Sequence, residues 1–269
     1  MERGVPVRAI SRGFAVLSAV SRDGPITLMG ISRSANVPYA TACRVVQTLM
    51  HEGLIERETG RKKYRVTSLV QSLATGFQQE DLLASEARPH MAELCKKVGW
   101  PISLATRVGT RMMVRESTHQ MTSLTFTNYY PGFTLPISEC ATGKAYLAYC
   151  DEDERSMIED AFKATDSEAA QTGLLLLSDG VALAKIRDAG YAMQARNLHN
   201  FEPGKTSSLA VPIMGTDDKL IGTMALIYFA SAIKPTEAAG EFLPMMQETA
   251  MTISETLGLG YDEQDSHAA

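Results

Sequence analysis

The sequence has few cysteines and lacks the spacings in which cysteine usually has a structural role. Its four cysteines, at positions 43, 95, 140 and 150 of 269 residues, form no C-x-x-C pair, and no histidine pair accompanies them at zinc-finger spacing. So few cysteines in so long a chain do not indicate a disulfide framework. We therefore interpret them as small, mostly buried residues and expect no metal and no cofactor.

Long apolar runs are also missing. No stretch approaches the roughly 18 residues that a membrane-crossing helix needs, and the first residues, MERGVPVRAISRG, lack the apolar core of a signal peptide. With 45% hydrophobic and 21% charged residues, the composition is that of a folded soluble protein. We expect a cytoplasmic protein with no membrane partner, long enough for two domains.

Motifs of nucleotide-dependent or nucleophilic catalysis are not evident. No Walker or Rossmann glycine pattern occurs in its required context. The thiol of Cys140, near a predicted helix start, could act as a nucleophile with His119 or His199 as its base. The spacing of these residues, however, does not indicate a catalytic triad. The acidic run DEDERSMIED is interpreted as a solvated helix start and not as a metal site. We therefore predict that the chain is not an enzyme.

Charge is distributed unevenly along the chain. Residues 1–80 hold 11 Lys/Arg and 6 Asp/Glu, a balance of +5, whereas residues 81–269 hold 15 Lys/Arg and 25 Asp/Glu, a balance of −10. Two parts of opposite sign suggest two functions, and the basic part is the candidate for contact with a polyanion. Chance surface variation could also produce this modest difference, so the local patterns must decide.

Three short helices are predicted in the basic part. Apolar residues with helical spacing indicate a first helix near 10–20, which RDGP ends. Thr27 is placed to cap a second helix at 28–35. A turn at 36–38 then leads into a third helix, and Gly53 ends it.

The third helix combines an apolar stripe with an opposite face suited to DNA. The stripe has the spacing i, i+3, i+4 and i+7, with Ala42, Val45, Val46 and Leu49. The opposite face carries small or hydrogen-bonding side chains around one arginine, namely Ala40, Thr41, Arg44, Gln47 and Thr48. Such a face can approach base-pair edges, where Arg bridges guanine O6 and N7 and a Thr methyl touches thymine.

A basic hairpin follows this helix. LIERE and RKKYRV alternate as two short strands joined at Thr59-Gly60. Together these elements predict a winged helix-turn-helix, with the third helix in the major groove and the wing along phosphates. The predicted DNA contacts are Arg8, Arg12, Thr27, Pro38, Tyr39, Thr41, Arg44, Gln47, Thr48, Arg61, Lys62 and Lys63. A three-helix protein-interaction module with no DNA role is the alternative.

Three stretches resemble the IclR family of bacterial transcriptional regulators. RAISRGFAVLSAV resembles the family's first helix, and PYATACRVVQTLMHEGLIER its Pro-x-x-Thr-x-x-Arg recognition helix and wing entry. LPISECATGKAYLAYC and SSLAVPIMGTDDKLIGTMALIYFA resemble its effector-domain signature. The resemblance covers about residues 7–258. Within the family, MVRESTH and LTFTNYYPGFTLPISECATGKAYLAYC are most similar to the subgroup that controls phenylpropionate and other aromatic-acid catabolism.

The resemblance implies a domain plan and partners. It implies that residues 84–260 form a GAF-like effector-binding domain. The residues themselves predict a winged helix-turn-helix domain at 1–67 and, from helical periodicity without a strong breaker, a linker helix at 68–83. A disordered tail is expected at 261–269. It implies a homodimer or dimer of dimers on a pseudo-palindromic operator in double-stranded DNA. The effector is expected to be a small organic acid, and RNA polymerase a partner if the protein is an activator.

The second half alternates strand and helix patterns. Helices are predicted near 86–98, 141–149, 153–161, 182–189 and 237–257, and strands near 102–108, 112–116, 124–129, 207–214 and 220–229. This order fits a mainly antiparallel sheet flanked by helices, so the chain is predicted to be of the α+β class.

A carboxylate site is predicted at the junction SECATGK, residues 138–144. Free N–H groups at a helix start attract anions, and the resemblance places Ala141 and Thr142 where relatives often contact their ligand. Ser208 matches a strand position that faces the pocket in relatives. An ordinary helix capped by Ser138 is the alternative.

The remaining pocket positions favour an apolar effector. Ala225 and Ile227 stand where some relatives that bind small, very polar acids carry serine. This departure, with Tyr129, Leu135 and Tyr228 nearby in sequence, favours an aromatic or apolar body with a polar end. A small aliphatic or sugar-derived acid is the alternative effector.

Five further residues are effector-binding candidates. Arg107, Arg115 and His119 could pair with a carboxylate, for which Arg is suited, although Arg107 could equally be a solvated strand residue. His199 and Asn200 lie in NLHNFEPG, a loop that could close over the pocket.

Overall fold

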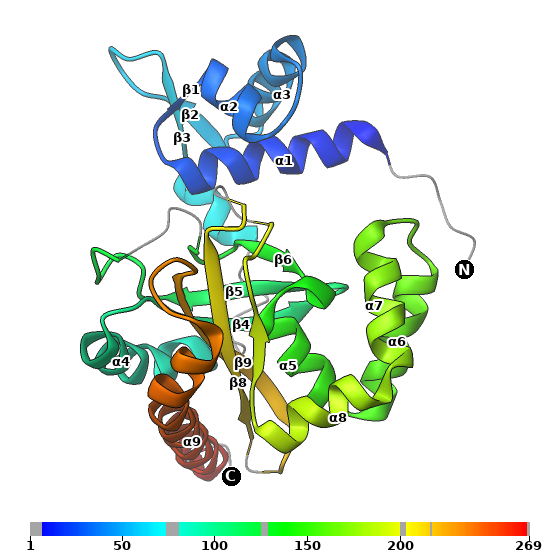
Figure 1. The fold of residues 1–269 in the computed structure, drawn as a ribbon. Helices are drawn as coiled ribbons and strands as arrows, with labels where there is room; N and C mark the ends of the chain where they lie inside the picture. Colours follow the sequence, from blue (N-terminus) through cyan, green and yellow to red (C-terminus); the bar gives the residue numbers. More distant parts are fainter. Residues whose placement is uncertain (1–6, 74–80, 125–128, 200–202, 216, 268–269) are drawn as a thin grey trace. The chain divides into compact units, whose positions relative to one another are not determined.

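Two units make up the chain, Met1–Gln79 and Glu80–Ala269. The structure is a computed structural model that describes residues 7–73, 81–124, 129–199, 203–215 and 217–267 (Figure 1). Each unit has its own hydrophobic core.

The first unit is a three-helix domain with a small sheet. Its elements are α1 (Arg8–Asp23), β1 (Ile26–Thr27), α2 (Leu28–Ser34), α3 (Tyr39–His51), β2 (Ile55–Arg57) and β3 (Lys63–Val66). The strands pair antiparallel in the order β1-β3-β2. The expected stripe of α3 is turned inward, with Ala42, Val46 and Leu49 buried. This arrangement confirms the predicted winged helix-turn-helix.

Local signals in the sequence fix the ends of these elements. Thr27 caps α2, because its Oγ1 accepts a hydrogen bond from Gly30 N at 3.2 Å. Gly53 after α3 and Gly60 in the hairpin turn have φ of 72° and 78°, a left-handed conformation that glycine adopts at little cost. The turn and the hairpin therefore lie where the sequence predicts them.

The second unit places helices on both faces of one sheet. Its elements are α4 (Asp81–Val98), β4 (Ile102–Val108), β5 (Arg111–Ser117), β6 (Thr134–Pro136), the 3-10 turn η2 (Ile137–Glu139), α5 (Ala141–Tyr149), α6 (Glu152–Lys163), α7 (Glu168–Ser178), α8 (Gly180–Ala189), β7 (Ala192–Gln194), β8 (Thr206–Met214), β9 (Leu220–Phe229) and α9 (Pro235–His267). The strand order is β6-β5-β4-β9-β8-β7, with every neighbouring pair antiparallel. This confirms the predicted antiparallel sheet flanked by helices.

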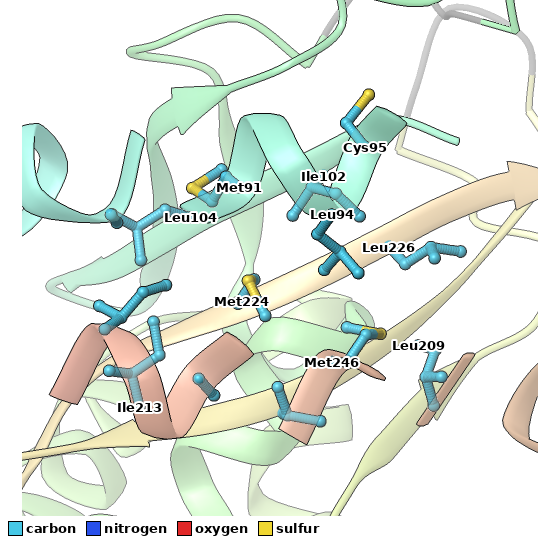
Figure 2. Packing of buried hydrophobic residues seen from close by; sticks show 14 of the residues in the cluster. Met91, Leu94, Cys95, Ile102, Leu104, Leu209, Ile213, Met224, Leu226 and Met246 are labelled. Atoms are coloured by element: carbon cyan, nitrogen blue, oxygen red, sulfur yellow. The ribbon is translucent and has the colours of Figure 1, made fainter. Parts of the chain in front are cut away.

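Strand alternation divides the side chains between two cores. On β9, Met224, Leu226 and Tyr228 belong to the core with α4 and α9, which Figure 2 shows from close by. The alternate residues, Ala225 and Ile227, face α5 and its neighbours. Tyr228 therefore points away from the cavity described below, and its expected contribution to an aromatic pocket is wrong.

Several predicted elements differ from the structure. The linker predicted at 68–83 is not one helix, since 68–73 form 3-10 turns, 74–80 lie outside the described residues, and α4 starts at Asp81. The tail predicted from residue 261 continues α9 to His267. The strand predicted at 124–129 falls largely on 125–128, outside the described residues. The sequence also gave no prediction of β6, α7 or β7.

Replacing Gly143 by alanine is expected to destabilise the second unit by about 1–3 kcal/mol. An added Cβ would lie 1.9 Å from the Ile137 carbonyl oxygen, so the backbone would have to shift. Chemical denaturation would measure the loss. The matched control is Gly240→Ala in α9, where no atom lies within 4 Å; it should be neutral or stabilising by up to about 1 kcal/mol. Equal stability of both variants would contradict the prediction.

Candidate DNA interface and effector cavity

The outer face of α3 offers hydrogen-bonding groups around one cation. Arg44, Gln47 and Thr48 are exposed and Thr41 is half-buried. Thr48 Oγ1 donates to the Arg44 carbonyl at 3.1 Å, so its oxygen stays available as an acceptor. Pro38 and Tyr39, also exposed, lie at the start of the same helix.

A groove between α1 and α3 brings two predicted contacts together. It has a volume of about 330 Å³ and is lined by Ala9, Arg12 and Gly13 of α1 and by Thr41, Arg44, Val45, Thr48 and Leu49 of α3. Neither Arg12 nor Arg44 has an ion-pair partner within the described residues. Arg8 lies one turn before Arg12 and is exposed. The groove is therefore a cationic feature beside the outer face of α3.

The hairpin presents a second cationic feature. Arg61 and Lys62 are exposed and Lys63 is half-buried, and within the described residues none of the three has a carboxylate partner. Arg65 differs, because it pairs with Glu56 on the neighbouring strand at 2.6 Å. Arg61, Lys62 and Lys63 are thus available to an external anion.

A small cavity in the second unit gathers seven of the twelve predicted effector contacts. It lies between the sheet and the start of α5, and its lining is Ser103, Ala105, Met112, Val114, Tyr129, Leu135, Cys140, Ala141, Thr142, Asn197, Ser208, Ala225 and Ile227. Its volume of about 10 Å³ is close to the space that one water molecule needs.

The start of α5 gives this cavity a donor end. Cys140 is the N-cap, since its Sγ accepts from Gly143 N at 3.3 Å. The next amides, of Ala141 and Thr142, belong to the first turn and have no acceptor within the helix. Ser138 does not cap the helix as considered; its hydroxyl donates to Ala169 O at 2.7 Å.

Asn197 supplies a donor that the sequence did not reveal. Its side chain is 1% exposed and lines the cavity, and its Nδ2 has no hydrogen-bond partner among the described residues. Its Oδ1 accepts from His199 N at 2.7 Å, and its backbone N–H donates to Thr206 O at 2.7 Å. An unpaired buried amide is costly, so this group is poised for an acceptor inside the cavity.

The described lining contains no side chain that carries a full charge. It has no Asp, Glu, Lys, Arg or His, and burial raises the pKa of the Cys140 thiol, which keeps it protonated. Such a lining stabilises an anion through backbone dipoles and neutral donors and leaves the rest of the surface apolar.

The predicted cationic partners lie elsewhere. Arg107 pairs with Glu154 of α6 at 2.7 Å, and Tyr146 also donates to that carboxylate. Arg115 Nη1 donates to Thr106 Oγ1 at 3.4 Å. His119 has a buried Nδ1 without a partner among the described residues, and burial lowers its pKa. None of these residues lines the cavity.

The loop candidates have a separate position. His199 Nε2 contacts the Glu139 carboxylate, and both residues line a cleft outside the cavity. Asn200 lies outside the described residues. Metal binding has no support in the part of the chain that the structure describes, where no three His, Cys, Asp or Glu side chains cluster suitably.

Two family models match the chain, one in its N-terminal part and one in its C-terminal part. Residues 9–59 match the IclR helix-turn-helix domain, and residues 77–255 match the family described as bacterial transcriptional regulator IclR C-terminal. The chain belongs to the IclR family of bacterial transcriptional regulators. The first model is that of a helix-turn-helix domain and the second that of the family's C-terminal domain.

Individual relatives of this IclR-family protein are distant. The probable transcriptional regulator SauR of Cupriavidus necator is 25% identical over 56% of this chain, and the match spans only 60% of SauR. An uncharacterized HTH-type transcriptional regulator of Haemophilus influenzae is 25% identical over 97% of this chain and 96% of its own. An IclR homolog from Microbacterium hydrocarbonoxydans, solved in complex with 4-hydroxybenzoate, has a TM-score of 0.63 at 22% identity, covering 93% of this chain and 98% of that one. This last likeness shows the shared fold.

Among the described residues, no single helix is long and apolar enough to cross a membrane. One bent pair, Glu168–Ser178 with Gly180–Ala189, reaches the required length and composition only when its two helices are combined.

Replacing Arg107 by methionine should lower stability and leave acid binding unchanged. The substitution leaves Glu154 without its cation in a partly buried site. Because both side chains are about one-fifth exposed, we expect the free energy of unfolding to fall by about 1–2 kcal/mol. Thermal unfolding and calorimetric titration would measure the two effects. Arg88→Met, which removes a pair in which the arginine is 69% exposed, is the control and should cost less than about 0.5 kcal/mol. Weaker acid binding at unchanged stability would return Arg107 to the effector site.

Proposed function

We propose that this protein regulates a catabolic operon and senses an aromatic carboxylic acid in the cavity at the start of α5. The observation that carries the proposal is the unpaired, buried Nδ2 of Asn197 in the same cavity as the first-turn amides of α5. Two independent sets of donors that converge on one enclosed space suit a carboxylate. Residues 84–260 would form the effector-binding domain and residues 1–67 the DNA-binding domain.

The apolar side of the cavity supports an aromatic body. Tyr129, Leu135, Met112 and Ile227 are buried around it and offer surface for a ring. The Microbacterium relative was solved with 4-hydroxybenzoate, an acid of this class. A small aliphatic or sugar-derived acid is the second candidate, and the cavity volume of about 10 Å³ favours it because a smaller ligand needs less rearrangement.

The DNA-binding mode follows from the first unit. We place α3 in the major groove, with Arg44 reading a base, and the hairpin along phosphates. A homodimer or dimer of dimers would present two such units to a pseudo-palindromic operator, and RNA polymerase would be a partner if the protein activates. The effector must favour one arrangement, typically by about 1–3 kcal/mol.

Substituting Arg44 by alanine should relax base preference, whereas neutralising the wing should not. Arg44→Ala is expected to cost about 1–3 kcal/mol at one base pair of the operator. A Lys62→Ala, Lys63→Ala double variant should weaken all sequences alike and reduce the salt slope by about 2, roughly 0.9 for each phosphate contact. Fluorescence anisotropy over an operator library at several salt concentrations separates the effects.

Each variant serves as the control for the other. Unchanged affinity and sequence preference in Arg44→Ala would remove α3 as the reading helix. An unchanged salt slope in the lysine variant would remove the wing from the phosphates. If no genomic fragment bound even at low salt, the protein-interaction alternative for residues 1–67 would replace the DNA-binding assignment.

An aromatic acid should raise the melting temperature, and Asn197 should be required. A ligand that binds only the folded state, present at 100 times its dissociation constant, raises the free energy of unfolding of the protein by about 2.7 kcal/mol. The panel would include benzoate, 4-hydroxybenzoate and 3-phenylpropionate against glyoxylate and pyruvate. Asn197→Leu should weaken the binding acid about 10- to 100-fold through the lost charge-assisted hydrogen bond.

Asn197→Asp is the matched control in this experiment. It keeps the shape of the side chain but replaces the donor by an acceptor, so it should also lose acid binding. A shift with glyoxylate or pyruvate and none with aromatic acids would favour the aliphatic alternative. Acid binding that is indifferent to both Asn197 variants would place the effector outside this cavity.

A further inference from the structure

A larger cleft lies outside the cavity and also borders the start of α5. Its volume is about 620 Å³, within the range of small-molecule sites, whereas the inner cavity holds about 10 Å³. The described lining comes from η2, α5, α7, the α7–α8 junction, β7 and the segment after β7. It comprises Ser138, Glu139, Lys144, Glu168, Ala169, Thr172, Leu175, Leu176, Asp179, Gln194, Leu198 and His199. Lining residues are not shared between the two spaces.

Lys144 is the unusual member of this lining. It is half-buried, and within the described residues its ammonium has neither an ion pair nor a hydrogen bond. Burial removes part of the hydration of this ammonium and so lowers the pKa of Lys144. The nearby Cys140 and Glu139 raise that pKa, but burial has the larger effect. A partly desolvated cation that faces an open cleft is best compensated by an anion from solution.

The acidic residues of the cleft have other roles. Glu139 contacts His199. Asp179 caps α8, since its Oδ1 accepts from Ala182 N at 3.3 Å, and Glu168 is exposed in the first turn of α7, where a negative charge is favourable. Glu139 and Asp179 therefore bind other groups and Glu168 is exposed to solvent. Among the described residues, none of these three carboxylates pairs with Lys144.

Leucine side chains provide the rest of the surface. Leu175 and Leu198 are 71% and 69% exposed, which is high for large apolar residues, and Leu176 is half-buried beside them. Thr172 and Gln194 add polar groups on the same lining. Lys144 beside these leucines offers an amphiphilic organic anion both a cation and an apolar surface, in a lining that also holds the carboxylates of Glu139, Glu168 and Asp179.

We propose that this outer cleft is a second small-molecule site, which binds an organic monocarboxylate with its head paired to Lys144 and its apolar body against Leu175, Leu176 and Leu198. The site does not depend on the effector assignment of the inner cavity. The chain nevertheless connects the two, because Glu139 precedes Cys140 and His199 follows Asn197 by two residues, so the contacting pair comes from segments that line both spaces.

Protection of Lys144 from reductive methylation tests the proposal, with octanoate as the probe and mass spectrometry of the full-length protein as the readout. Octanoate at ten times its dissociation constant should slow methylation of Lys144 about tenfold, the fraction left free by mass action. Exposed Lys96 and Lys163 are internal controls and should be unaffected. Octanol, which has the same chain without the charge, should give no protection.

Substitutions at Lys144 provide the second arm. By calorimetry, Lys144→Met should weaken octanoate binding about 10- to 100-fold, and Lys144→Arg should restore most of it. Equal methylation rates with and without octanoate, or full affinity in Lys144→Met, would overturn the second site. Failure of the inner-cavity assignment would appear separately, as indifference of aromatic-acid binding to Asn197.

Discussion

The backbone of Ile137 and the first turn of α5 lie closer together than any side chain at position 143 would permit. A Cβ there would lie 1.9 Å from the Ile137 carbonyl oxygen, so glycine is required for η2 to fold back against the helix. The contact sets where the amides of Ala141 and Thr142 point. The inner cavity and the outer cleft both border this junction, so both sites depend on it.

A cluster of alanines between α5 and the sheet also constrains the position of this helix. Ala141 and Ala145 of the helix meet Ala192, Ala210 and Ala225 of three neighbouring strands in one small cluster. Small residues on both sides let the helix approach the sheet closely. On the opposite face the same strands carry large residues that pack against α4 and α9 (Figure 2). One set of strands thus provides a rigid core on one face and a site on the other.

Local patterns predicted much of the fold. The bounds of α5, β4 and β9 match the predicted 141–149, 102–108 and 220–229, because each has a clear period and a clear end. In contrast, α7 contains the run LLLL and has no marked polar face, and β6 is only three residues long. Elements of this kind depend on tertiary packing more than on their own sequence.

The predicted effector contacts that do not line the inner cavity have a related explanation. Arg107 satisfies its charge with Glu154, which is 47 residues away and on another element, so no local pattern could assign the pair. Asn197 is buried, and its backbone bonds to Thr206 and Gly204. The prediction named its neighbours His199 and Asn200, whereas Asn197 is the residue that lines the cavity with an amide nitrogen that has no partner among the described residues. Burial in a loop is a tertiary property, and composition does not report it.

The size of the inner cavity has a consequence for regulation. A volume of about 10 Å³ cannot hold even a small organic acid, so binding requires the surrounding side chains to move. Leu135 lies on β6, the edge strand of the sheet, and Met112, an adaptable side chain, lies on the neighbouring β5, so their displacement disturbs few neighbours. Binding would therefore favour a rearranged state of this domain over the compact one. A difference in affinity between two states is what allows a ligand to shift their populations, and a cavity too small for its ligand provides that difference directly.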